Sequence, residues 1–226
     1  MKETGRTLKK KLFDLLNQGD LERAIAAADH FVPRQIINPL LSFIQSGNEK
    51  LKWGAVKLIG RVVTRLAERD LESARVIMRR LMWNLNDESG GMGWGSPEAM
   101  GEILAAHGGL AREYAPILLS YAREDGNYLE HEGLQRGLLW GIGRLSEKRP
   151  ELVREASVFL LPYLQSPDAM IRGLSVRIMG LLKEKHAVPR LRGLTEDEAE
   201  LTFLLGNTLT TLQVKDLAQE ALRAIQ

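Results

Sequence analysis

The chain contains no cysteine. Disulfide bonds, thiolate metal sites and a cysteine nucleophile are therefore excluded. Long apolar runs are also missing, since no stretch approaches the roughly 18 residues that a membrane span requires. The first residues, MKETGRTLKKKLFDLLNQG, lack the apolar core and small-residue cleavage site of a signal peptide. We therefore expect a cytoplasmic protein that does not contact a membrane.

Neither sign of charge is in excess. The 31 basic and 29 acidic residues give a formal net charge of +2, so no global attraction to nucleic acid or to a membrane surface is implied. A partner of that kind would have to contact a local patch. With 226 residues, of which 44% are hydrophobic, the chain is long enough to bury a substantial core, as one large domain or one short repeat array.

Strand patterns are scarce, whereas apolar residues at helical spacing recur through most of the chain. Glycine and proline punctuation divides the sequence into roughly ten or eleven short helices. Four glycines recur at intervals of about 40 residues, which is typical of a helical solenoid with two helices per unit. Small residues at these positions let one helix lie close to its neighbours. The repeated segments are WGAVKLIG (53–60), WGSPEAMG (94–101), RGLLWGIG (136–143) and GLSVRIMG (173–180).

Two segments resemble a known repeat family. DAMIRGLSVRIMG (168–180) and AVPRLRGL (187–194) are similar to the HEAT repeats, nearest to the short HEAT-like repeats named after phycobilisome lyases. DEAELTFLLGNTL (197–209) continues that pattern, with Thr202 in place of the usual arginine. The resemblance implies an all-α, right-handed α-solenoid of antiparallel helix pairs that forms a single domain over 1–226. Capping helices would occupy 1–32 and 213–226, and the repeats would occupy 33–212.

HEAT arrays usually act as scaffolds, and their second helices line the concave face. Because residues four apart share a helix face, the glycine register predicts one exposed ridge along these helices. Tryptophan and arginine are enriched in interaction hot spots, which favours a binding surface there. The alternative is that the tryptophans pack and that Glu98 and Glu102 form a charge ladder with Arg61 and Arg144. The ridge comprises Trp53, Lys57, Arg61, Trp94, Glu98, Glu102, Arg136, Trp140 and Arg144, followed by Gly173, Arg177 and Leu181 in the last repeat.

The stretch NDESGGMGWGSP (86–97) interrupts the repeat pattern. Ser96-Pro97 is typical of a helix start, so this glycine-rich loop replaces about two turns of helix. We predict a recess at 87–95, beside Trp83 and Trp94. The carboxylates of Asp87 and Glu88 would suit a cationic group. The alternative is a helix cap followed by a tight turn.

These patterns favour a non-catalytic binding module that recognises a protein or peptide partner on its concave face. We expect no cofactor, and we assign no catalytic or metal-binding residue. One alternative is a nucleic-acid-binding protein that resembles the HEAT-like alkylpurine DNA glycosylases, with Trp53, Trp94, Trp140 and Asp87 near the base. Its phosphate-binding residues would be Lys57, Arg61, Arg136, Arg144 and Arg177.

A second alternative is a small-molecule or metal-binding enzyme, for which Glu130-His131-Glu132 is a weak candidate. The sequence does not reveal the oligomeric state.

Overall fold

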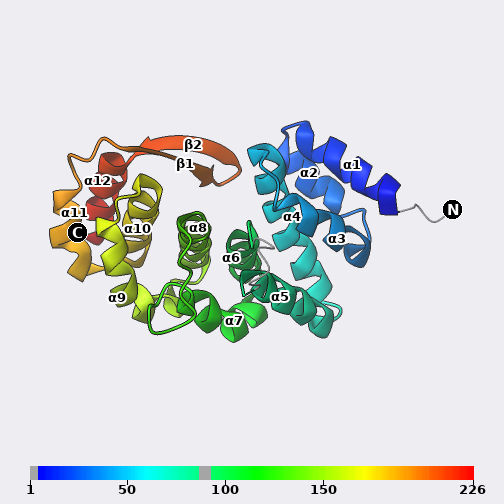
Figure 1. Cartoon of the computed structure of the whole chain (residues 1–226), viewed down its shortest axis with the longest axis horizontal. Helices are drawn as coiled ribbons and strands as arrows, with labels where there is room; N and C mark the ends of the chain where they lie inside the picture. The colour runs from blue at the N-terminus through cyan, green and yellow to red at the C-terminus, as the bar shows by residue number, and fades with distance from the viewer. Residues whose placement is uncertain (1–4, 87–92) are drawn as a thin grey trace. The chain divides into compact units, whose positions relative to one another are not determined.

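The computed structural model describes residues 5–86 and 93–226 (Figure 1). Twelve α-helices, four short 3-10 helices and one two-stranded sheet are formed by these residues, which confirms the predicted all-α repeat fold. The chain divides into two compact units, Met1–Leu110 (unit 1) and Ala111–Gln226 (unit 2). Among the described residues, no helix combines the length and the apolar character needed to cross a membrane.

Unit 1 is organised around one long helix, α4, which packs against each of the other helices of this unit. The side chain of Asn48 caps α4 by accepting a hydrogen bond from the backbone N–H of Leu51 (3.2 Å). The helices of unit 1 are α1 (Gly5–Asn17), α2 (Leu21–Ala28), α3 (Pro33–Phe43), α4 (Glu49–Ala67), α5 (Leu71–Leu85) and α6 (Ser96–Ala106).

In unit 2 the helices α8, α10 and α12 lie side by side in that order (Figure 1). The division between the units falls within α7. The elements are α7 (Gly108–Ser120), α8 (Glu132–Lys148), η1 (Pro150–Leu152), η2 (Arg154–Ala156), α9 (Ser157–Leu160), η3 (Leu161–Gln165), α10 (Ala169–Leu182), η4 (Lys185–Ala187), α11 (Val188–Gly193), β1 (Glu200–Leu205), β2 (Thr208–Gln213) and α12 (Val214–Ile225).

Three of the four repeated glycines, Gly60, Gly143 and Gly180, lie at helix contacts, as predicted. A Cβ at Gly60 of α4 would stand 2.6 Å from Cγ of Glu102 on α6. A Cβ at Gly180 of α10 would stand 2.9 Å from both Cα and Cβ of Ala221 on α12. Gly143 is less crowded, because its Cβ would meet Ile178 at an ordinary 3.7 Å.

The segment 197–209, which we predicted to continue the helical repeat, instead enters a β-hairpin, so that prediction was wrong. β1 and β2 pair antiparallel, with Leu205 opposite Thr208. Gly206 and Asn207 form the two-residue turn, and Gly206 has a φ of +62°. A Gly-Asn pair flanked by β-branched, leucine and phenylalanine residues is a strong local signal for a hairpin.

Trp140 of α8 is covered by this hairpin. Its indole is only 4% exposed, and its Nε1–H donates a hydrogen bond to the backbone carbonyl of Leu204 (2.8 Å). Gly173 of α10 lies against Leu201 of β1, where a side chain on α10 would collide with the leucine. The prediction that Trp140 projects from an exposed ridge was therefore wrong.

Two glycines at the same repeat position provide a test of the helix contacts. We expect Gly180→Ala to lower the free energy of unfolding by about 1–2 kcal/mol, because the new methyl group meets the backbone of α12. We expect Gly143→Ala to be neutral or stabilising by up to about 1 kcal/mol, because alanine favours the helix and the methyl group has room. Urea unfolding followed by circular dichroism measures both changes. Equal effects of the two substitutions would show that the glycine contacts are misplaced.

Trp140→Phe tests the attachment of the hairpin. Phenylalanine cannot donate to the Leu204 carbonyl, and a buried acceptor left without its donor costs about 1–3 kcal/mol. We expect faster amide hydrogen exchange in β1 and β2, with little change in α12. Trp83→Phe is the control, because Trp83 is 72% exposed on α5. If the amide exchange rates of β1 and β2 are unchanged in Trp140→Phe, the Trp140 hydrogen bond does not hold the hairpin.

Candidate functional site

The predicted ridge of unit 1 is largely buried. Trp53 is buried, and its indole Nε1–H donates to Glu49 (2.7 Å). Lys57, Glu98 and Glu102 are also buried, because α6 lies along α4 and the two ridges face each other. The prediction that these four ridge residues are exposed was therefore wrong.

The buried charges of unit 1 pair between the two helices. Glu98 forms an ion pair with Lys52 (2.8 Å), and Glu102 forms one with Lys57. Burial alone would lower the pKa of Lys52, but the attraction of Glu98 and its hydrogen bond outweigh this effect and raise the pKa above its ordinary value. The predicted charge ladder therefore exists in unit 1, with lysines of α4 as partners in place of arginines.

The arginines of the ridge also have carboxylate partners. Arg61 is exposed and donates two hydrogen bonds to Asp29 (2.9 and 2.7 Å). In unit 2, Arg144 and Arg177 both pair with Glu147. Arg136 is exposed and pairs with Asp168, the residue that caps α10. Each of these arginines thus stabilises contacts within its own unit.

Part of the predicted recess at 87–95 lies outside the described residues, including Asp87 and Glu88. The described end of the loop is a tight helix start. Gly95 caps α6 with a φ of +76°, and a Cβ there would run into the backbone of Ile44. Trp94 is half-buried, while Trp83 is exposed. A pocket at this loop remains a prediction.

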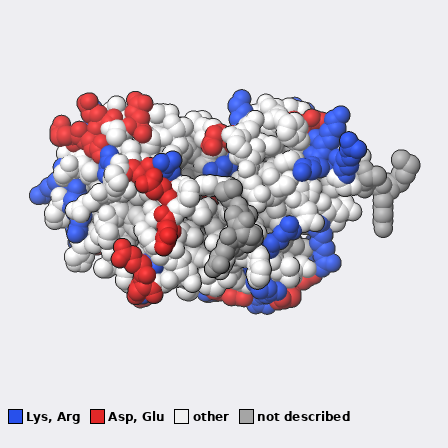
Figure 2. Space-filling model, viewed as in Figure 1, with Lys and Arg blue, Asp and Glu red and all other residues white. Residues whose placement is uncertain are grey.

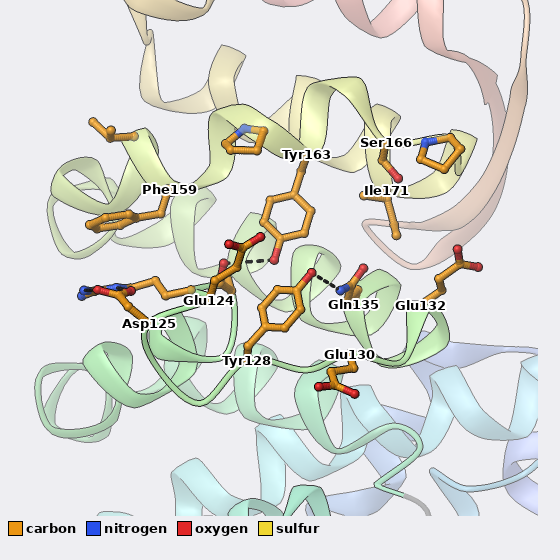
Figure 3. A pocket seen from close by; sticks show the side chains of 15 residues that line it. Glu124, Asp125, Tyr128, Glu130, Glu132, Gln135, Phe159, Tyr163, Ser166 and Ile171 are labelled. Carbon is orange, nitrogen blue, oxygen red and sulfur yellow. Dashed lines mark hydrogen bonds and ion pairs between the residues drawn. The ribbon is translucent and has the colours of Figure 1, made fainter.

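A groove of about 720 Å³ lies elsewhere, within unit 2. It runs between the α7–α8 connection (residues 121–131) and the segment formed by α9, η3 and the start of α10 (Figure 3). Three aromatic and four acidic residues are among its fifteen lining residues. The lining residues are Ala122, Arg123, Glu124, Asp125, Tyr128, Glu130, Glu132, Gln135, Val158, Phe159, Pro162, Tyr163, Ser166, Pro167 and Ile171.

The α7–α8 connection is held by hydrogen bonds to its flanking helices. The backbone N–H and the side-chain amide of Asn127 donate to the carbonyl and hydroxyl oxygens of Ser120 (3.0 and 2.9 Å). The buried side chain of Gln135 donates to the carbonyl of Leu129 (2.8 Å). Gly126 lies so close to Ser120 that a Cβ would stand 2.6 Å from its carbonyl oxygen. This wall of the groove is therefore held in place by hydrogen bonds within the chain.

Two tyrosines point toward each other across the groove (Figure 3). The Tyr163 hydroxyl donates to the carbonyl of Ala122 (3.0 Å), and the Tyr128 hydroxyl accepts from Gln135 (2.8 Å). Burial raises the pKa of Tyr163, and Tyr128 and Glu124 raise it further. The Tyr163 phenol therefore stays neutral at physiological pH and keeps its hydrogen bond across the groove.

The rim of the groove is acidic. Among the described residues, Glu124, Glu130 and Glu132 have no ion-pair partner, and Asp125 pairs with Arg123 (2.7 Å). Arg123 is the one cation among the described lining residues, against four carboxylates. An excess of carboxylates beside aromatic rings favours a cationic group.

The same segment contains Glu130-His131-Glu132, the weak metal candidate. These residues do not form a metal-binding cluster, and no such cluster of three His, Asp or Glu side chains occurs among the described residues. The His131 ring nitrogen Nδ1 instead accepts a hydrogen bond from the backbone N–H of Gly133 (3.0 Å) at the start of α8.

Sequence reasoning missed the groove. The run Glu124 to Glu132 was visible as an acidic, tyrosine-containing connection, but its spacing gives no sign that residues 158–171 lie against it. Two residues of this wall, Phe159 and Tyr163, fall in a stretch of short 3-10 and α-helical turns, where the repeat register does not apply.

Comparisons with known proteins show the fold. No protein-family model and no curated protein matches the sequence. An engineered protein of known structure is 14% identical with a TM-score of 0.59, over 100% of this chain and 92% of that one. A designed armadillo repeat protein in complex with the peptide (KR)4 is 16% identical with a TM-score of 0.54, over 96% of this chain and 98% of that one.

A set of armadillo repeat proteins computationally designed for modular peptide recognition gives a TM-score of 0.51 at 16% identity, over 96% of this chain and 99% of that one. At such low identity the likeness concerns the fold alone. The chain therefore has an armadillo- or HEAT-like helical repeat fold.

Proposed function

We propose that this chain is a non-catalytic binding module that holds a peptide segment of a protein partner in the groove of unit 2. The observation that carries the proposal is the groove itself, which combines about 720 Å³ of space with three aromatic side chains and a prearranged wall. Tyrosine and phenylalanine bury a large area at small entropic cost, so they suit the recognition of a peptide. A wall that is fixed in advance lowers the cost of binding.

The fold supports the proposal at a coarse level. Helical repeat proteins present extended surfaces on a stacked frame. Of the designed armadillo neighbours, one set was designed for modular peptide recognition and another protein is in complex with the peptide (KR)4. We also propose that residues 168–194 are related to the short HEAT-like repeats named after phycobilisome lyases. The loop at 87–95 and the exposed ridge arginines Arg61 and Arg136 remain candidate surfaces, but the groove is better supported because all of its lining residues are described and most of them are at least partly exposed.

The nucleic-acid alternative is less well supported. Its five candidate phosphate-binding cations already pair with carboxylates, and two of its tryptophans, Trp53 and Trp140, are buried. Basic side chains do gather over α1 in Figure 2, a helix whose sequence contains Arg6, Lys9, Lys10 and Lys11, but none of these is among the candidate phosphate-binding residues. Acidic side chains gather between α11 and β1, where the sequence has Glu196, Asp197, Glu198 and Glu200.

The proposal is tested with peptides selected from a displayed random library on the purified chain. We expect Phe159→Ala to weaken binding of the selected peptides about tenfold or more, because Phe159 lines the groove and aromatic anchors carry much of the binding energy. The thermal midpoint should hardly change, since Phe159 is 41% exposed. Phe13→Ala is the matched control, because Phe13 is 42% exposed on α1 of unit 1.

Equal loss of affinity in both phenylalanine variants, or no selected peptide at all, would contradict the groove as the binding site. The nucleic-acid alternative is tested by titrating the chain with duplex DNA at increasing salt concentrations. Binding to phosphates weakens steeply as counterions are released, whereas a peptide held by aromatic side chains should be less sensitive to salt.

A further inference from the structure

One end of the groove already holds a guanidinium group. Arg123 donates from Nε to Asp125 Oδ1 (3.0 Å) and from Nη2 to Oδ2 (2.7 Å). The same guanidinium lies over the ring of Phe159, with its central carbon 4.4 Å from the ring centroid. A bidentate carboxylate and an aromatic face are the two contacts that recognise arginine most specifically. We call this pair of Asp125 and Phe159 the guanidinium clamp.

The clamp is built from two walls of the groove. Asp125 belongs to the α7–α8 connection and Phe159 to α9, and Figure 3 shows both at the same end of the groove. The clamp is open to solvent, since the Asp125 side chain is 72% exposed. An aspartate is ionised at neutral pH, and the hydrogen bond from Arg123 holds the pKa of Asp125 below its ordinary value.

We infer that Arg123 occupies the position of a partner's arginine, and that an arginine-bearing peptide displaces it from the guanidinium clamp. This inference rests on the proposed function of the groove and names the partner's chemistry. Arg123 and Asp125 are only two residues apart, so the internal ion pair forms without closing a long loop. An exposed ion pair of this kind contributes little to stability, and its replacement by an equivalent pair is therefore feasible.

The charge of the groove fits a peptide with more than one cationic residue. Glu124, Glu130 and Glu132 line the groove beyond the clamp and have no ion-pair partner among the described residues. In Figure 3, Glu132 lies toward the end of the groove opposite Phe159. An arginine in the clamp would thus be followed by carboxylates that attract neighbouring lysines or arginines.

Lysine should be a poorer occupant of the clamp. Its ammonium group is a compact point charge that cannot form the two parallel hydrogen bonds or stack as a plane on Phe159. The surrounding carboxylates attract both cations through their charge alone. A difference in affinity between arginine and lysine peptides therefore measures the contribution of the clamp. The affinity that the two peptides share measures the contribution of the acidic rim.

The experiment compares two fluorescein-labelled octapeptides, one alternating Gly and Arg and the other alternating Gly and Lys. Their binding to the full chain is measured by fluorescence anisotropy. Arg123→Ala vacates the clamp, so we expect the arginine peptide to bind about two- to fivefold more tightly than it binds the unmodified chain. The affinity of the lysine peptide should increase less. Asp125→Asn added to Arg123→Ala should abolish the arginine preference, since it removes the bidentate carboxylate.

Arg123→Ala is compared directly with the unmodified chain, because an exposed ion pair contributes little to stability. An equal gain for both peptides would overturn the inference, since it would come from the lost positive charge alone. The inference would also be overturned if Arg123→Ala binds the arginine peptide with unchanged or lower affinity. If library peptides that depend on Phe159 bind without any arginine preference, the inference fails while the proposed function stands. If no peptide binds through Phe159, both fail.

Discussion

At Gly180 the backbone of α10 lies so close to Ala221 of α12 that a side chain on α10 would meet the neighbouring helix. At Gly60 in unit 1, α4 lies similarly close to Glu102 of α6. Close approach increases the number of dispersion contacts between helices and leaves little space between them. The stacking of α4 on α6 and of α10 on α12 depends on this constraint.

The close approach of α4 and α6 explains why the predicted ridge of unit 1 is largely buried. Side chains that would face solvent on an isolated helix are enclosed between the two helices, and a charge enclosed in this way needs a partner. The pairs Lys52–Glu98 and Lys57–Glu102 meet that need. Because these pairs are enclosed between α4 and α6, they are less accessible than the exposed Arg123–Asp125 pair in the groove of unit 2.

The groove arises where the repeat pattern is least regular. Between α8 and α10 the chain forms only short turns, which bring Phe159 and Tyr163 against the α7–α8 connection. The connection is rigid because Gly126 permits a close turn and Gln135 ties Leu129 in place. Connecting segments that are held by packed helices can present charged and aromatic side chains at the surface. On a helix face that is packed against a neighbouring helix, such side chains would be buried or paired.

The sequence by itself determined the helical periodicity, the spacing of the glycines and local features such as the cap at Asn48, because these depend on residues that are close along the chain. It also contained the Gly206-Asn207 turn, which the helical repeat pattern obscured. Only the tertiary structure decided that Trp53, Lys57, Glu98, Glu102 and Trp140 of the ridge are buried. It also decided that the Arg123 guanidinium lies between Asp125 and Phe159. Burial depends on how closely two helices approach, and adjacency depends on contacts between segments that are distant in sequence, so neither is encoded in a local pattern.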